Sequence, residues 1–240
     1  MRSVLQTSRR SSTQALGRRQ EALRDYEAAL AVEPRNPSAH HNRGVVLEKL
    51  GRLEDAVEAF DAAVDCGGDR TRGAALYARA LVLEKLNKYR AAKASFDGAV
   101  AATPKDAEYH HSRGTNARHR GDHAAAVAAF SAALKLDPHH RTARANRAYA
   151  RRKIGDFVGA RRDYTKALED APTAKLYNAR AYCSAKLEKF DAAVADYTEA
   201  LRLDPANAHA LHNRGISYDR LGRDDEAARD FERALELEGS

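Results

Sequence analysis

Small and aromatic residues follow a helical spacing along most of this chain. The stretch 107–140 shows it most clearly, because Ala126, Phe130 and Ala133 are separated by four and then three positions. That spacing places the three side chains on one face of a helix. Small residues also predominate between them. The pattern predicts a helix packed against a neighbour.

A second helix precedes this one, and both have clear ends. It covers Ala107–Arg120 with Gly114 near its middle, and Gly121 supplies the turn between the two helices. Pro138 then ends the second helix, because proline cannot extend a helix and restricts the residue before it. Residues 107–140 are therefore predicted to form a hairpin of two helices.

The same hairpin pattern recurs at a nearly fixed period. The prolines that end the blocks are 70, 34, 34 and 33 residues apart, and the first gap spans two blocks. These prolines are Pro34, Pro104, Pro138, Pro172 and Pro205. The predicted turn residues are Gly17, Gly51, Asn87, Gly121, Gly155, Glu188 and Gly222. A period of this length indicates one supersecondary unit copied along the chain.

The residues at equivalent positions are alike from block to block. The second-helix triplets are Ala22/Tyr26/Ala29, Ala56/Phe60/Ala63, Ala92/Phe96/Ala99, Ala126/Phe130/Ala133, Ala160/Tyr164/Ala167, Ala193/Tyr197/Ala200 and Ala227/Phe231/Ala234. The small residues inside the first helices are Gly44, Ala80, Gly114, Ala148, Ala181 and Gly215. Small residues let helices approach closely, and the aromatic residues are expected to fill the space between adjacent hairpins.

These features closely resemble the tetratricopeptide repeat pattern of a small residue within the first helix, Ala-x-x-x-aromatic in the second, and a closing proline. The resemblance implies an all-α fold, a right-handed superhelical solenoid of helix-turn-helix repeats with a concave groove. Six repeats are placed at 37–72, 73–106, 107–140, 141–173, 174–207 and 208–240. Residues 1–36 are assigned to a degenerate partial repeat whose second helix covers about 18–33.

Three segments depart from the regular pattern. The first repeat has a two-residue insertion within Cys66–Arg70, where paired glycines predict a kink or a mobile loop. Residues 1–19 are rich in Arg and Ser without acids, so they fit either a degenerate helix, which we favour, or an organelle transit peptide. The last repeat is expected to leave Phe231 and Leu235 for a partner or a further repeat to cover.

Composition and charge narrow the class of protein. Apolar residues make up 43% of the 240 residues, Trp is absent, and no apolar run reaches the ~18 residues of a membrane span. Cys66 and Cys183 stand far apart, which predicts no disulfide framework and a reducing, cytoplasmic location; organelle targeting is the alternative. The net charge of +7 comes from residues 1–20 and 107–172, since the rest is net negative by four.

An arginine precedes the small residue of every predicted first helix. These residues are Arg43, Arg79, Arg113, Arg147, Arg180 and Arg214. They could form a row of cations for an acidic ligand, but we favour an internal role in which each head group meets a carboxylate on the second helix. The expected partners are Asp163, Asp196 and Asp230.

A basic region in the third and fourth repeats predicts the binding site. His111, Thr115 and Arg118 are spaced i, i+4 and i+7 on one helix face, the face that lines the groove in the resembled family. Tyr149 and Arg152 occupy the matching positions one repeat later. Uncompensated positive charge indicates an anionic ligand, although acids on adjacent helices could instead balance it.

Part of the sequence also resembles the clamp by which co-chaperone tetratricopeptide domains bind the C-terminal carboxylates of chaperones. Asn146 stands where that clamp places its middle Asn, and Lys175 where its third repeat places a Lys. The other three clamp positions hold His111, Thr115 and Ala179 instead. Chaperone-tail binding is therefore kept as an alternative.

No catalytic set or cofactor motif is recognised in the sequence. It has no Gly-rich phosphate loop and no Gly-x-Ser-x-Gly, and its adjacent His pairs point apart on a helix, which is unsuited to a metal. We predict a protein without enzymatic activity, cofactor or metal, acting as a scaffold or adaptor that binds an acidic or C-terminal peptide in its groove. The remaining alternatives are a subunit of a ciliary or transport assembly and an RNA-binding protein.

Overall fold

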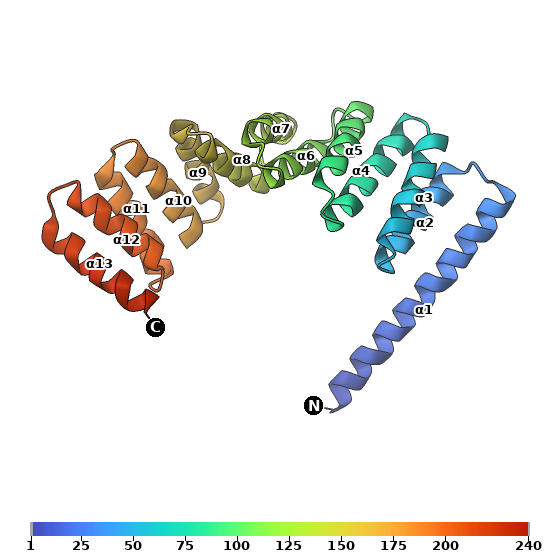
Figure 1. Ribbon diagram of the computed structural model, residues 1–240, viewed down its shortest axis with the longest axis horizontal. Helices are drawn as coiled ribbons and strands as arrows, with labels where there is room; N and C mark the ends of the chain where they lie inside the picture. The colour runs from blue at the N-terminus through green and yellow to red at the C-terminus, as the bar shows by residue number, and fades with distance from the viewer. Residues whose placement is uncertain (1, 240) are drawn as a thin grey trace. The chain divides into compact units, whose positions relative to one another are not determined.

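The computed structural model describes the backbone of residues 2–239 and the side chains of residues 16–239. Thirteen helices and no strand are found in this part of the chain, so the predicted all-α class is confirmed (Figure 1). The chain divides into two compact units, Met1–Arg120 and Gly121–Ser240, here named unit 1 and unit 2. The third predicted repeat contributes its first helix to unit 1 and its second to unit 2.

Unit 1 contains six helices, each packed against the next along the chain. They are α1 (Arg2–Val32), α2 (Pro37–Lys49), α3 (Leu53–Cys66), α4 (Asp69–Lys85), α5 (Tyr89–Ala102) and α6 (Ala107–His119). Leu47, Phe60 and Val82 form a fully buried cluster between α2, α3 and α4. The predicted aromatic position of the second helix is thus a core position in this unit.

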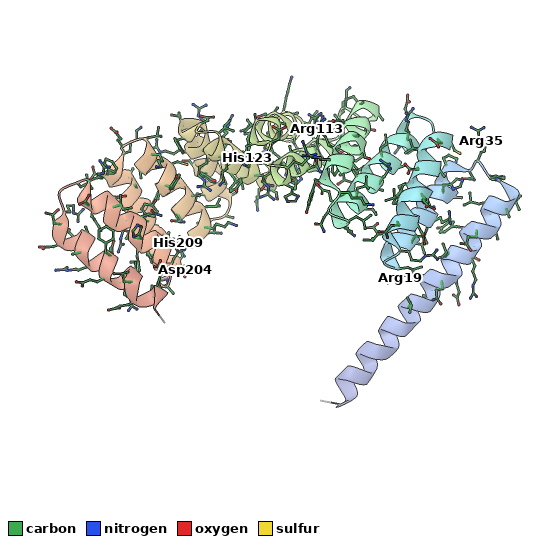
Figure 2. The ribbon with its side chains drawn as sticks, viewed as in Figure 1. Arg19, Arg35, Arg113, His123, Asp204 and His209 are labelled. Atoms are coloured by element: carbon green, nitrogen blue, oxygen red, sulfur yellow. The ribbon has the colours of Figure 1, made fainter. Side chains whose placement is uncertain are left out.

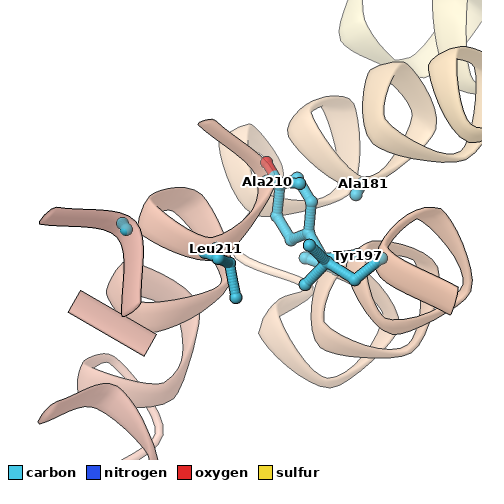
Figure 3. Packing of buried hydrophobic residues seen from close by; sticks show 7 residues of the cluster. Ala181, Tyr197, Ala210 and Leu211 are labelled. Carbon is cyan, nitrogen blue, oxygen red and sulfur yellow. The ribbon is translucent and has the colours of Figure 1, made fainter. Parts of the chain in front are cut away.

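Unit 2 contains seven helices arranged in the same consecutive manner. They are α7 (His123–Leu136), α8 (Arg141–Lys153), α9 (Phe157–Asp170), α10 (Ala174–Lys186), α11 (Phe190–Leu203), α12 (Ala208–Asp219) and α13 (Asp224–Glu238). Tyr197 and Leu211 pack among Ala181 and Ala210 (Figure 3). Small residues at the last two positions allow the helices to approach closely around the ring.

The turns inside the hairpins confirm six of the seven predicted turn residues. Each has a positive φ, and they are Gly51, Asn87, Gly121, Gly155, Glu188 and Gly222. Side-chain caps then start many helices, as when Asn36 accepts a hydrogen bond from the Ala39 N–H and Asp156 accepts one from the Gly159 N–H. Local sequence therefore sets where these helices begin.

The seventh predicted turn, at Gly17, is wrong. Residue 17 lies inside α1, a continuous helix of 31 residues, so the segment 18–33 is not a separate second helix. Residues that form helices well, Ala15-Leu16 and Arg18-Arg19-Gln20, flank this glycine, and an interior Gly costs a helix only about 1 kcal/mol. Arg19 donates from Nη1 to the Lys49 carbonyl at 3.2 Å, at the end of α2 (Figure 2).

The insertion in the first predicted repeat does not form a long loop. Only Gly67 and Gly68 separate α3 from α4, and both have extended backbone angles. The extra residues instead lengthen α4, which has 17 residues where α2 and α6 have 13. A helix absorbs them because each added residue gains another backbone hydrogen bond.

The last helix is only partly uncovered. Phe231 is half-buried, with its ring against Gly215, whereas Leu235 is 70% exposed. The other exposed positions of α13 are mostly charged, including Arg229, Glu232 and Arg233. No helix in the described residues is both long and apolar enough to cross a bilayer.

Candidate functional site

The three predicted site residues of unit 1 share one face of α6. His111, Thr115 and Arg118 are all half-buried there. Asp106 fixes the start of the helix by accepting hydrogen bonds from two backbone N–H groups. The His111 Nδ1 lies 3.3 Å from the Glu108 Oε1, and an Arg118 Nη2 lies 3.4 Å from the His119 Nε2. These side chains are therefore held by neighbours on their own helix.

The predicted residues of unit 2 meet more closely around Arg152. Its guanidinium carbon lies 5.4 Å from the centre of the Tyr149 ring and 5.1 Å from that of Tyr182. The Lys153 Nζ lies 5.7 Å from the Tyr149 ring and the Lys186 Nζ 5.5 Å from the Tyr182 ring. Distances below about 6 Å are those of cation–π contacts. Basic side chains and tyrosine rings from α8 and α10 therefore contact one another on one surface.

Lys175 does not join this group. It is exposed in the first turn of α10, whereas Tyr182 comes seven residues later in the same helix. Seven residues correspond to about 10 Å along a helix axis. Asn146 lies on α8, half-buried and one turn before Tyr149 and Ala150.

Sequence reasoning missed Tyr182 and Lys186, although the repeat contained the signal for both. Tyr182 follows Tyr149 by 33 residues, and Lys186 follows Lys153 by the same number. These pairs are equivalent positions of consecutive first helices. We define the surface of Tyr149, Arg152, Lys153, Tyr182 and Lys186 as the α8–α10 face.

Next to this face, α10, α11 and α12 enclose a pocket of about 300 Å3. Tyr182 and Ile216 line it, and they also stand at equivalent positions of their repeats. Tyr197, which is 1% exposed, lies on its buried side, and the exposed Lys186 and Arg220 lie on its solvent side. Apolar walls with a few polar groups are typical of ligand sites.

Burial keeps the titratable groups under Arg152 neutral. Burial raises the pKa of Tyr164 to about 12, against the opposing effect of Arg152, and raises the pKa of the Cys183 thiol to about 11. Burial also raises the pKa of Tyr197. A low dielectric disfavours the phenolate and thiolate forms. The charge of the α8–α10 face therefore comes from Arg and Lys.

The repeated arginines of unit 2 are internal, as predicted. Each donates through Nε and Nη2 to both oxygens of one carboxylate on the second helix of its hairpin, at 2.6–2.8 Å. The pairs are Arg147–Asp163, Arg180–Asp196 and Arg214–Asp230. These bonds hold the arginines inside the hairpins. Any cations that bind an acidic ligand must therefore come from other positions.

In unit 1 the carboxylate partners come from elsewhere. The Arg79 Nε lies 2.6 Å from an oxygen of Asp61 on α3, the helix before its own hairpin. The Arg113 Nη1 lies 3.8 Å from Asp97 on α5 in the same relation. Arg79 also donates to the Ser95 hydroxyl at 2.6 Å. The predicted partners, all on the second helix of the same hairpin, do not include these two acids.

Helix pairs with a small residue facing an aromatic ring define the class of this protein as an α-helical repeat solenoid. One tetratricopeptide repeat model matches residues 12–71, 77–140 and 111–175, another matches residues 208–240, and a TPR repeat model matches residues 180–222. The chain belongs to the tetratricopeptide repeat family.

Several known proteins are similar to this chain. The uncharacterized protein MJ0572 of Methanocaldococcus jannaschii is 35% identical over 77 residues, 31% of this chain and 90% of that protein. The C-terminal part of a TPR repeat-containing protein from Cytophaga hutchinsonii has a TM-score of 0.72 at 16% identity, covering 93% of this chain and 92% of that one. MamA from Desulfovibrio magneticus has a TM-score of 0.66 at 21% identity, covering 72% and 96%. At such identities the structures show a shared fold.

Proposed function

We propose that this protein is a non-enzymatic interaction scaffold that binds an acidic peptide segment on the α8–α10 face. Tetratricopeptide repeat proteins are generally non-enzymatic scaffolds for other proteins, and the family membership supports the same general role here. The observation that carries the finer proposal is Arg152, which lies about 5 Å from two tyrosine rings with Lys153 and Lys186 beside them.

The charges on this face suit a carboxylate ligand. Lys153 and Lys186 are exposed, and Arg152 is half-buried over the rings. A guanidinium held in place loses less side-chain freedom when it binds a carboxylate, which favours affinity. The tyrosine rings offer apolar contact to the rest of the peptide. The expected ligand is an extended segment with several Asp or Glu residues.

The predicted unit 1 residues supply a further basic face. Arg118 and His111 lie on α6, and Arg118 extends the set of cations available to the scaffold. Arg118→Glu tests this face by itself, and we expect it to weaken the binding of an acidic peptide to unit 1.

Direct binding tests the proposal. The probe is a fluorescein-labelled 12-residue peptide of Asp, Glu and Ser with one Phe, titrated by fluorescence anisotropy. Lys153→Glu/Lys186→Glu should weaken binding by about tenfold or more, because two favourable charge contacts become repulsive. Affinity should also fall as salt rises, since exposed charges are screened within about 8–10 Å.

The matched control reverses the charge of two basic residues that lie outside this face. Arg202→Glu/Arg233→Glu changes net charge by the same amount, and both residues are exposed on α11 and α13. It should bind the peptide within about twofold of the unaltered chain, corresponding to less than about 0.5 kcal/mol. If both variants lose the same affinity, net charge alone explains the loss, and the proposed site is wrong.

RNA is the rival ligand with an observation in its favour, since two tyrosines adjoin the cations. Base stacking requires accessible ring faces, but Arg152 lies over both rings. A gel-shift titration with single-stranded RNA separates the two ligands. Tight RNA binding without peptide binding would replace the proposal. The chaperone-tail alternative predicts that amidating the peptide's C-terminus abolishes binding.

A further inference from the structure

The pocket between α10, α11 and α12 has no role in the charge-based proposal above. It lies in unit 2, beside the α8–α10 face, and Tyr182 and Lys186 belong to both. A peptide bound across α8 and α10 would therefore meet the pocket next. The two features are best considered as parts of one binding surface.

The walls of the pocket are suited to an apolar side chain with a ring. Tyr182, Phe190 and Ile216 supply carbon surface, and Tyr197 closes the buried side. Aromatic side chains prefer edge-to-face or offset contact with other rings, which these residues offer. Phe190 and Tyr182 come from different helices, α11 and α10, so a ring between them would contact both.

The polar groups around the opening indicate what adjoins the anchor. Lys186 and Arg220 are exposed at the pocket, and Asn213 supplies an amide, while Glu188 is the acid of the lining. Two cations against one acid favour a carboxylate beside the anchor. An amide is able to hydrogen-bond the backbone of an extended segment.

Positive charge is not uniform along the first helices of unit 2. The position of Arg152 on α8 is occupied by Ala185 on α10 and by Asp219 on α12. The cations are thus concentrated toward α8 and the apolar pocket lies toward α12. Neighbouring packed helices are about 8–10 Å apart, which an extended chain crosses in about three residues.

We infer that this pocket is an anchor subsite, one that takes a single aromatic side chain of the acidic peptide, with the main acidic cluster about three to six residues away over α8 and α10. The inference rests on the proposed function. It adds the determinant of specificity, because charge alone would accept any acidic segment, whereas an anchor selects one with a ring at a fixed distance from its acids.

Peptides that differ only in the anchor test this inference. Four labelled 12-residue peptides carry the same acidic cluster and have Phe, Leu or Ala at the anchor position, or Phe moved next to the cluster. We expect the Phe peptide to bind about tenfold more tightly than the Ala peptide, since a buried ring removes a large apolar area from water. The Leu peptide should be intermediate, and the moved Phe should bind like Ala.

The matching protein variant is Ile216→Gln. Ile216 is 40% exposed, so the change leaves the core intact, and unchanged circular dichroism would verify this. We expect the Phe peptide to lose about fivefold or more in affinity and the Ala peptide to change by less than twofold. Leu203→Gln is the control, because Leu203 is 43% exposed on α11 and does not line the pocket.

The outcomes separate the inference from the function on which it rests. If all four acidic peptides bind equally, the anchor subsite is wrong and the acidic-peptide proposal stands. If a fifth peptide, with Phe at the anchor position and neutral residues in place of the acids, binds as tightly as the acidic Phe peptide, the pocket stands and the charge-based function is wrong. If no peptide binds, both are overturned.

Discussion

Units 1 and 2 place the partner of their repeated arginine on opposite sides. In unit 2 the carboxylate lies on the second helix of the same hairpin, as in Arg180–Asp196, and the arginine also donates to a hydroxyl of the preceding hairpin, Thr165. In unit 1 the carboxylate lies on the preceding helix, as in Arg79–Asp61, and the hydroxyl of Ser95 lies in the same hairpin. At Arg79, therefore, the acid and the hydroxyl have exchanged places.

This exchange changes how deeply the charges are buried. The side chains of Asp163, Asp196 and Asp230 are 5%, 11% and 8% exposed, whereas those of Asp61 and Asp97 are 48% and 43% exposed. Breaking a buried pair leaves a desolvated charge, but breaking an exposed pair costs little. The arginine therefore braces the inside of each hairpin in unit 2 and connects successive hairpins weakly in unit 1.

The largest effect is expected at Asp163, which accepts from both Arg147 and Arg151. Asp163→Ala should destabilise unit 2 by about 3–5 kcal/mol, because two guanidinium groups lose their shared partner. Asp61→Ala in unit 1 should cost less than about 1 kcal/mol. Hydrogen exchange of α8–α9 and of α3–α4 measures the two effects separately, and similar losses would remove the distinction between the units.

Alkaline pH should weaken unit 2 through Tyr164. Burial raises its folded pKa to about 12 from an unfolded value of 10.0, so the neutral phenol stabilises the fold fully below pH 10, and this contribution disappears as pH rises toward 12. The loss should reach roughly 2–3 kcal/mol. Denaturation at pH 8 to 11.5 measures it, with Tyr164→Phe as control. If Tyr164→Phe loses stability with rising pH as steeply as the unaltered chain, a group other than Tyr164 causes the loss.

One glycine in each unit faces an aromatic ring of the second helix of its hairpin. A Cβ on Gly44 would lie 2.7 Å from the Phe60 ring, and one on Gly215 would lie 2.7 Å from the Phe231 ring. Phe60 is fully buried, whereas Phe231 is half-buried in the last hairpin and has room to move. Gly44→Ala should cost about 1–3 kcal/mol, and Gly215→Ala clearly less, in thermal denaturation. Equal costs would show that the end hairpin is as rigid as the first.

A double substitution converts one hairpin of unit 1 to the arrangement of unit 2. Asp61→Ser/Ser95→Asp moves the acid beside Arg79 into its own hairpin. The double variant should be more stable than Asp61→Ser alone by about 1 kcal/mol, because Ser95 is 1% exposed and the new pair is more buried. A double-mutant cycle measured in urea gives the coupling energy. Additive single effects would mean that the position of the acid is irrelevant.

The smallest effect is expected at the turn residues. Glu188 has φ +58° and Asn87 has φ +57°, where the other hairpins use glycine. Glu188→Gly should stabilise unit 2 by about 0.5–1 kcal/mol, since the left-handed region costs a residue with a side chain about 1–2 kcal/mol and the greater entropy of glycine in the unfolded chain offsets part of this gain. Asn87→Gly should change stability less, because Asn tolerates this region. The urea midpoints of the two variants test the order.

The sequence predicted most of the hairpins, since their signals are local. Glycine or a tolerant residue marks each turn, and the alternation of small and aromatic residues marks each packed face. Two predictions failed because the surrounding residues continue a helix through a position where the local sequence indicates a turn or loop. Gly17 lies inside a helix because its neighbours propagate the helix across it, and the insertion before α4 became helix in place of a loop.

The candidate site was predicted less completely, because contacts between hairpins depend on geometry. The helix-face spacing selected Arg118 and Arg152 as candidates, which remain predictions, whereas the acid beside each unit 2 arginine was anticipated from its position. The pocket required Tyr182, Tyr197 and Ile216 to converge from three helices. The partners of Arg79 and Arg113 were not predicted because both acids lie on the preceding helix, outside the hairpin that begins with the arginine.

The exchanged acid limits how such a gene can grow by duplication. A hairpin copied within its own half meets a neighbour that already carries the complementary group. Suppose that a hairpin from the second half were placed before the hairpin of Arg79. Its Thr would then stand where Asp61 stands now, and the arginine's own hairpin offers only Ser95, so the guanidinium would have no carboxylate partner. Unequal crossing-over between the halves should therefore be selected against, and recombination within each half tolerated.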